Sequence, residues 1–180
     1  MLLGLCGFVG SGKGAIVDYL KRKGWSHYAT KDVIREELAK HDIPATRNSM
    51  IMMGNTLRAQ HGGGVLAQRM MLRMPLAGNV IVESIRHPDE VRTLRKRADF
   101  VLLAVSAHTD LRFRRIATRA RPGDPTTIEE LRALDDRESD TSSSGVRIKE
   151  CVLMAEATIV NDGTLEKLHR SVDEFLLRYR

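Results

Sequence analysis

The chain has 180 residues and a net charge of +6, and hydrophobic residues make up 42% of it. This size accommodates one well-buried domain and leaves little room for a second. No apolar run approaches the roughly 20 residues of a membrane span, and the apolar start has neither the length nor the basic flank of a signal peptide. The two cysteines do not make a disulfide framework. We therefore expect a cytoplasmic protein without membrane association.

In chain order, the residue patterns predict a strand over 2–6, a helix over 12–23, a strand over 25–28, a helix from residue 30, helices over 47–61 and 65–74, a strand over 79–83, a helix over 88–97, a strand over 100–105, helices over 109–119, 128–138 and 146–155, a strand over 158–160 and a helix over 165–179. Thr30 is expected to cap its helix. The serines at 142–144 suggest a flexible stretch. Strands that alternate with helices imply a parallel sheet covered on both faces. The predicted fold is therefore α/β, with three layers and a five-stranded parallel sheet.

The strongest local signal is the glycine-rich segment between the first strand and the first helix. Gly7, Gly12 and Lys13 have the Gly-x4-Gly-Lys spacing of a phosphate-binding loop. Backbone N–H groups of such a loop, with the helix N-terminus behind it, surround a phosphate chain. The usual Ser or Thr after the lysine is replaced by Gly14 and Ala15. The predicted ATP-binding residues of this segment are Gly7, Gly10, Ser11, Gly12, Lys13, Gly14 and Ala15.

Arginine supplies most of the positive charge. General solubility, nucleic-acid binding and the grip of a small anionic substrate would each explain the excess. Aromatic residues are 4% of the chain, which leaves few stacking platforms for nucleic acid, so nucleic acid is not the expected partner. Arginine binds phosphate with two N–H groups at once, and the arginines therefore direct attention to small-molecule nucleotides.

The run Gly-Ser-Gly-Lys-Gly resembles the loop of the adenylate kinase-like nucleoside monophosphate kinases, in which Lys-Gly replaces Lys-Ser. Two later segments resemble that family in order. Thr30-x-Asp32-x-x-Arg35 is similar to its acceptor-site stretch, although a capped surface helix with a charge pair is the alternative. Glu83-Ser84-x-Arg86 resembles its Asp-Gly-x-x-Arg, with Glu and Ser as substitutions. His87 is expected to be a surface neighbour of this segment.

The resemblance implies roles for these residues. In the family magnesium is held largely by water and nucleotide oxygens, and the carboxylate after the third strand organises the magnesium waters. It thus implies ATP and Mg²⁺ as cofactors, with Glu83 on the metal through water. The implied acceptor-binding residues are Thr30, Asp32, Arg35, Arg58, Glu83 and Arg86.

Arg112, Arg115 and Arg119 fall on one face of their predicted helix. A solvated basic stripe is one interpretation. The family has a similar helix that leads into a mobile lid, and residues 121–145, with few apolar anchors, would be that lid. Asn161 and Gly163 stand where the family's loop packs along the adenine, and a plain turn is an equal alternative.

The resemblance covers nearly the whole chain and implies ATP-dependent phosphoryl transfer to a nucleoside or deoxynucleoside monophosphate. The implied catalytic residues are Lys13, Arg86, Arg115 and Arg119. A single kinase domain is expected, with a core at 1–29, 78–120 and 146–180, an acceptor-binding insertion at 30–77 and a lid at 121–145, as a monomer or homodimer.

Alternatives to that activity stay open. The segment 84–91 is similar to less-characterised kinases described as dephospho-coenzyme A kinase-like or deoxynucleotide kinase-like. In a dephospho-coenzyme A kinase, Asp32 would serve as the base. A nucleotide-binding regulator that has lost turnover is the alternative outside the enzymes.

Overall fold

The structure is a computed structural model that describes residues 1–139 and 145–179, so the predicted flexible serines at 142–144 lie outside the described residues. Within them, one parallel sheet has the strand order β2-β3-β1-β4-β5. Its strands are β1 (Leu2–Cys6), β2 (Ser26–Ala29), β3 (Val80–Glu83), β4 (Phe100–Ser106) and β5 (Ala157–Val160). The predicted five-stranded parallel sheet is confirmed.

The helices that connect and cover the strands also lie close to their predicted ranges. They are α1 (Lys13–Arg22), α2 (Thr30–Lys40), α3 (Arg47–His61), α4 (Val65–Met71), α5 (Pro88–Leu94), α6 (Thr109–Arg119), α7 (Ile128–Arg137), α8 (Ile148–Leu153) and α9 (Leu165–Arg178).

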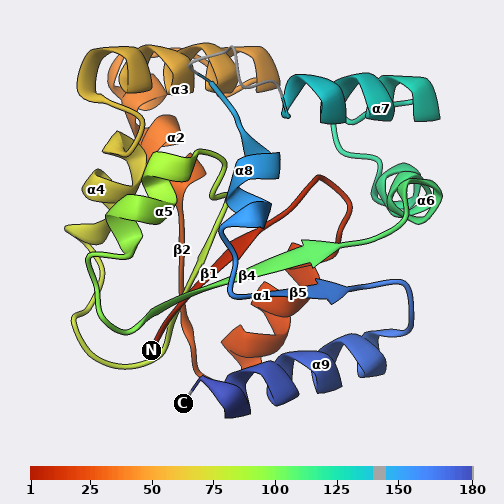
Figure 1. Ribbon diagram of the computed structural model, residues 1–180. Helices are drawn as coiled ribbons and strands as arrows, with labels where there is room; N and C mark the ends of the chain where they lie inside the picture. The colour runs from red at the N-terminus through yellow and green to blue at the C-terminus, as the bar shows by residue number, and fades with distance from the viewer. Residues whose placement is uncertain (140–144, 180) are drawn as a thin grey trace.

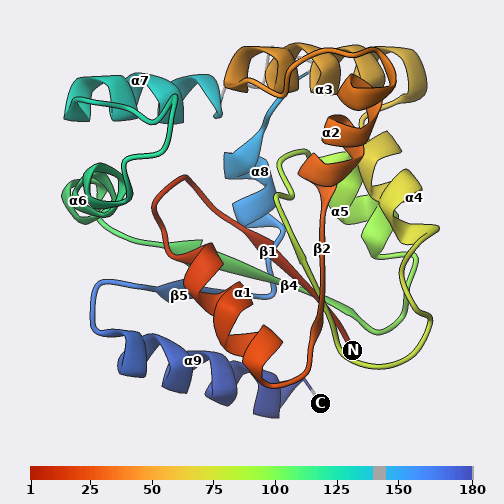
Figure 2. The same cartoon turned by 180° about the vertical axis from the view of Figure 1, so that it is seen from behind.

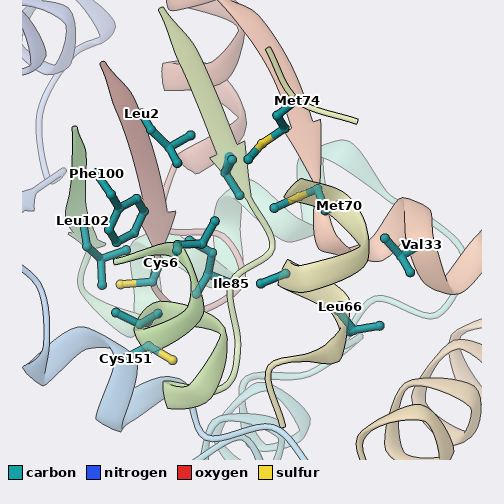
Figure 3. Packing of buried hydrophobic residues seen from close by; sticks show 14 of the residues in the cluster. Leu2, Cys6, Val33, Leu66, Met70, Met74, Ile85, Phe100, Leu102 and Cys151 are labelled. Atoms are coloured by element: carbon teal, nitrogen blue, oxygen red, sulfur yellow. The ribbon is translucent and has the colours of Figure 1, made fainter. Parts of the chain in front are cut away.

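Side chains of the central strand β1 point alternately to the two faces of the sheet, and each face has its own hydrophobic core cluster. Leu3 and Leu5 point to the face covered by α1 and α9. Leu2 and Cys6 point to the other face, where the helices α2 to α5 and α8 pack (Figures 1 and 2). Figure 3 shows Cys6 beside Cys151 of α8 in this second cluster. Both faces are therefore buried, as a parallel sheet requires, and the three-layer prediction is confirmed.

The parallel pairing of the strands places their carboxyl ends at one edge of the sheet. The predicted site residues lie in the segments that follow these ends. Strand β1 lies between β3 and β4, and Ala29 at the end of β2 pairs with Glu83 at the end of β3. Ligands of parallel α/β sheets bind outside these carboxyl ends. The sheet thus brings the glycine loop after β1 beside the segments that follow β2 and β3.

Two local predictions are wrong. Thr30 does not cap α2, because it is the first helical residue and its buried hydroxyl donates to the Ser84 carbonyl oxygen at 2.6 Å. His87 is not a surface residue, since it is 5% exposed. Its Nδ1 accepts the Asp89 N–H at 3.2 Å and forms a capping box with Glu90 at the start of α5.

The expected lid includes α7, one face of which is apolar and buried. Leu131 and Leu134 on α7 are buried, so the few apolar residues of this segment do anchor it. Helices α3 and α7 lie along the same edge of the molecule (Figure 1), and Arg47 of α3 donates to the Gly123 carbonyl at 2.5 Å. Among the described helices, none has the length and apolarity to cross a bilayer.

Candidate active site

The glycine loop has backbone geometry that excludes side chains at its key positions. Gly7, Gly10 and Gly12 all have positive φ, at 133°, 78° and 107°. A Cβ at Gly7 would lie 2.2 Å from the Val105 carbonyl oxygen, and one at Gly12 would lie 2.1 Å from Asn161 Nδ2. Only glycine combines these dihedral angles with this close approach. The loop therefore has the tight turn that exposes backbone N–H groups to a phosphate.

Lys13 lies folded across this loop. Its Nζ donates to the Gly7 carbonyl at 2.6 Å and to the Phe8 carbonyl at 2.9 Å. Burial, reinforced by the positive charge of Arg86, lowers the pKa of Lys13 to about 8. An anion bound in the loop would reverse this effect, because an opposite charge nearby favours the charged ammonium.

The loop is braced from behind by Asn161 and by an arginine of α6. Asn161 is 6% exposed and its Nδ2 donates to the Ser11 carbonyl at 2.9 Å. Arg115 donates to the Asn161 carbonyl at 2.8 Å. Gly163 is exposed nearby. Gly14 faces open space, since a Cβ there would meet no atom within 4 Å.

Two other arginines of α6, Arg112 and Arg119, are engaged in ion pairs. Arg112 is 4% exposed, pairs with Asp135 of α7 and donates to the Val9 carbonyl of the loop at 3.0 Å. Arg119 forms two hydrogen bonds of 2.8 Å with Asp124. This face of α6 is therefore not a freely solvated stripe, and it ties the glycine loop to the segment expected to be the lid.

A cavity of about 350 Å³ adjoins the loop on the side of β4 and α6. Polar side chains in its wall include Ser11, Ser106, Arg112, Asp135 and Lys149. The space beside the loop is thus partly enclosed, with polar and apolar side chains in its wall.

On the acceptor side, Glu83 at the end of β3 is held by two basic side chains. Lys31 Nζ donates to Glu83 Oε1 at 2.5 Å, and His27 Nε2 lies 3.5 Å from the same oxygen. Burial opposes ionisation of Glu83, but the neighbouring His27 and the hydrogen bond from Lys31 outweigh burial and lower the pKa of Glu83 to about 2. The next residue, Ser84, has φ 64°, a left-handed conformation that favours glycine. Ser84 therefore makes the backbone turn that follows β3 without a glycine.

These residues do not fit a metal held by the protein. The carboxylate of Glu83 is already neutralised by Lys31, and Gly14 and Ala15 bring no hydroxyl to the loop. Among the described residues, there is no cluster of three His, Cys, Asp or Glu side chains that could hold a metal ion.

Arg86 links the end of β3 to the far end of the expected lid. Its guanidinium donates to Glu138 Oε1 at 2.5 Å, its backbone N–H donates to Glu90 at 2.8 Å, and its carbonyl accepts the Arg147 N–H at 2.7 Å. Glu138 is 7% exposed, so the pair is shielded on the carboxylate side.

The structure divides the remaining acceptor residues between two environments. Arg35 and Asp32 form an exposed pair on α2 at 2.9 Å. Arg58 is buried within α3 and its guanidinium pairs with the fully buried Glu90 at 2.9 Å. Thr30, Glu83 and Arg86 are brought to the ends of β2 and β3, whereas Arg58 lies inside the core that supports them.

Relatives that align with nearly the whole chain carry the name UPF0200. No family model matches the chain. The UPF0200 protein of Hyperthermus butylicus is 31% identical over 180 residues, which covers 99% of this chain and 94% of that relative. The UPF0200 protein PH1008 of Pyrococcus horikoshii is 30% identical over 184 residues, which covers 97% of this chain and 95% of that relative. The chain belongs to the UPF0200 family.

Solved structures show that this UPF0200 chain has a P-loop kinase fold. TT1252 from Thermus thermophilus aligns with a TM-score of 0.63 at 19% identity, covering 100% of this chain and 98% of that one. Shikimate kinase from Acinetobacter baumannii, solved in complex with shikimate, aligns with a TM-score of 0.59 at 17% identity, covering 98% and 93%. Identities this low establish the fold alone.

Several residues of this candidate site were not among those predicted from the sequence. Lys31, His27 and Glu138 all contact predicted site residues, and Glu90 supports two of them. The spacing of Lys31 and Arg35, four residues apart on one helix, was a usable signal. The partners of Arg58 and Arg86 had no such signal, because they lie 32 and 52 residues away in the chain.

Proposed function

We propose that this UPF0200 protein transfers the terminal phosphate of ATP to the phosphate group of a nucleoside or deoxynucleoside monophosphate. The observation that carries the proposal is the meeting of a glycine loop and its lysine with Arg86 and Lys31 at one edge of the sheet. Such an enzyme works by positioning its substrates and by neutralising charge. The glycine loop with Lys13, and the ion-paired cations Lys31 and Arg86, would serve these two needs.

The two substrates would occupy opposite sides of the glycine loop. ATP phosphates would lie on the loop N–H groups and Lys13, with Arg115 and Arg119 on the side of α6. The acceptor phosphate would lie against Arg35 and Arg86. In this proposal residues 30–77 form the acceptor-binding part and residues 121–145 the lid, and the bond from Arg47 to Gly123 supports their approach over the site.

The pairing of the carboxylates favours a phosphate acceptor over a hydroxyl acceptor. A hydroxyl acceptor needs a general base whose pKa is near the working pH. Glu83 has a pKa of about 2 and is paired with Lys31. Asp32, the base expected for a dephospho-coenzyme A kinase, is paired with Arg35. A phosphate monoester is already an anionic nucleophile and requires no base.

Magnesium would enter this site as part of the nucleotide. Since the donor set around Glu83 does not fit a protein-held ion, we assign no step to a metal bound by the chain. Lys13 and the arginines then account for the positive charge that the protein itself contributes to the transferred group.

The lack of a hydroxyl at Gly14 and Ala15, together with the engaged Glu83, favours one other candidate. A protein with a phosphate loop but weakened catalytic parts could be a nucleotide-binding regulator. Such a protein would bind ATP without an acceptor-dependent reaction.

Measurement of ADP production separates these possibilities. Purified protein is incubated with ATP and magnesium, and with each nucleoside and deoxynucleoside monophosphate in turn. Dephospho-coenzyme A and shikimate serve as hydroxyl acceptors. We expect ADP formation that depends on one or more monophosphates. Turnover only with a hydroxyl acceptor would contradict the proposal, and ATP binding without any turnover would identify a regulator.

A further inference from the structure

Lys31 occupies a position that is electrostatically unfavourable for a lysine. It is the second residue of α2, and the first turn of a helix favours negative side chains over positive ones. Arg35 follows at i+4, so two like charges lie on the same side of the helix. Residues that break a local rule in this way are expected at functional sites.

The ammonium group of Lys31 lies at the carboxyl end of β3, the edge of the sheet where ligands of parallel α/β folds bind. Its Nζ donates to Glu83 Oε1 at 2.5 Å, and this is the hydrogen bond it makes with the described residues. An ammonium has three N–H donors, so two remain for another acceptor. The side chain is 37% exposed, whereas Glu83 is 13% exposed. Glu83 thus holds the ammonium group of Lys31 in place, while part of the Lys31 side chain stays accessible to solvent.

The surrounding charges favour an anionic ligand at this point. Arg35 lies one helical turn away, and Arg86 is three residues beyond Glu83 in the adjoining loop. The charges of Arg86 and Glu83 both act on Lys13, which places the glycine loop in the same electrostatic neighbourhood. Lys31 and Arg35 each have one carboxylate partner, Glu83 and Asp32, and a phosphate beside Lys31 would be a further acceptor for both cations.

We propose that Lys31 binds the phosphate group of the acceptor and that Glu83 positions it for this contact. The inference rests on the proposed function for the nature of the acceptor, but the phosphate contact itself does not require turnover. Glu83 then positions the ammonium group of Lys31 rather than a metal ion.

The test measures binding of inorganic phosphate to this side of the site alone. Lys13→Ala disables the glycine loop, and calorimetry follows phosphate binding to that variant. Addition of Lys31→Met, which keeps the side-chain stem but removes the charge, should weaken phosphate binding about tenfold or more, as expected for a charge-assisted hydrogen bond. Lys31→Arg should retain most of the affinity. Lys40→Met, on the same helix and paired only with Glu37 among the described residues, should leave it unchanged.

Two results would overturn the inference. One is the absence of phosphate binding to the Lys13→Ala protein at millimolar phosphate. The other is an unchanged affinity after Lys31→Met with a lowered melting temperature, which would make the Lys31–Glu83 pair a structural contact only.

Turnover measurements keep this test apart from the proposed function. In otherwise native protein, Lys31→Met should raise the KM of the acceptor and leave that of ATP unchanged. If phosphate binding depends on Lys31 but no monophosphate accepts phosphate from ATP, the proposed function is wrong and the inference stands. If transfer occurs but Lys31→Met changes neither phosphate affinity nor acceptor KM, the inference is wrong and the function stands.

Discussion

The proposed donor and acceptor sides of the site are built in different ways. The donor side is a short backbone loop whose conformation depends on three glycines with positive φ. The acceptor side is a set of side-chain ion pairs, such as Lys31 with Glu83 and Arg86 with Glu138, that join segments 52 residues apart. A backbone site is specified within a few residues, whereas an ion-pair site exists only after the sheet has aligned its strands. The following experiments test this contrast.

The largest expected effect is on the donor side. Lys13→Ala should reduce turnover on the order of 10³-fold, because it removes a preorganised positive charge from the transferred phosphate. The free energy of unfolding should not fall, since burial of Lys13 disfavours its charged form. Steady-state kinetics and urea unfolding measure the two quantities, with Lys21→Ala on the exposed side of α1 as the control. Full activity in the Lys13 variant would remove the glycine loop from the site.

On the acceptor side the largest effect should be on stability. Glu90→Gln leaves the charge of Arg58, whose side chain is 4% exposed, without its partner. Loss of one partner of a buried pair costs about 3–5 kcal/mol. Asp89→Asn on the same helix breaks a more exposed pair with Arg92 and should cost at most about 1 kcal/mol. Equal losses from the two variants, measured by urea unfolding, would show that burial of the Arg58 pair is unimportant.

Arg35→Ala should separate the two sides kinetically. Arg35 is exposed and pairs only with Asp32 among the described residues, so stability should change little. Loss of a charge-assisted contact of about 1.5–3 kcal/mol should raise the acceptor KM about tenfold or more. The KM of ATP should stay the same. Arg73→Ala, which breaks another exposed pair with α2, is the control, and an equal rise in both KM values would contradict separate sites.

The pKa of Lys13 predicts proton uptake when a phosphate binds in the loop. In the free protein this pKa is about 8, below its ordinary value of 10.5. A bound anion raises it, so lysine that is neutral at about pH 8.5 becomes protonated on binding, whereas at about pH 6.5 it is protonated in both states. Calorimetry of ADP binding in buffers of different ionisation enthalpy measures the uptake. Equal uptake at both pH values would refute the assignment to Lys13.

The smallest effect is expected at the turn after β3. Ser84 has φ 64°, and glycine adopts this conformation without steric cost. Ser84→Gly should therefore leave the free energy of unfolding unchanged or raise it by up to about 1 kcal/mol. Ser84→Val should lower it, because branched side chains are strongly disfavoured there. Urea unfolding measures the free energy of unfolding of both variants. A marked decrease in the glycine variant would mean that the serine hydroxyl stabilises the turn.

The sheet, the order of helices and strands, and the glycine loop can all be predicted from local sequence patterns. These features depend on apolar runs and on local dihedral angles, which neighbouring residues control. The sequence also placed the arginines of α6 on one face, since helical periodicity requires only the spacing of the residues.

Which charged side chains pair with one another depends on the folded arrangement of the strands and helices. Pairing of Ala29 with Glu83 in the sheet brings the first turn of α2, and with it Lys31, beside Glu83. A buried ion pair joins Arg58 of α3 to Glu90 of α5, and the chain after α7 brings Glu138 to Arg86. Sequence spacing carries no information about these pairs, because their energy depends on distance and burial in the folded chain. Thr30 and His87 were misjudged for the same reason, since their partners and their burial come from strand order and helix packing.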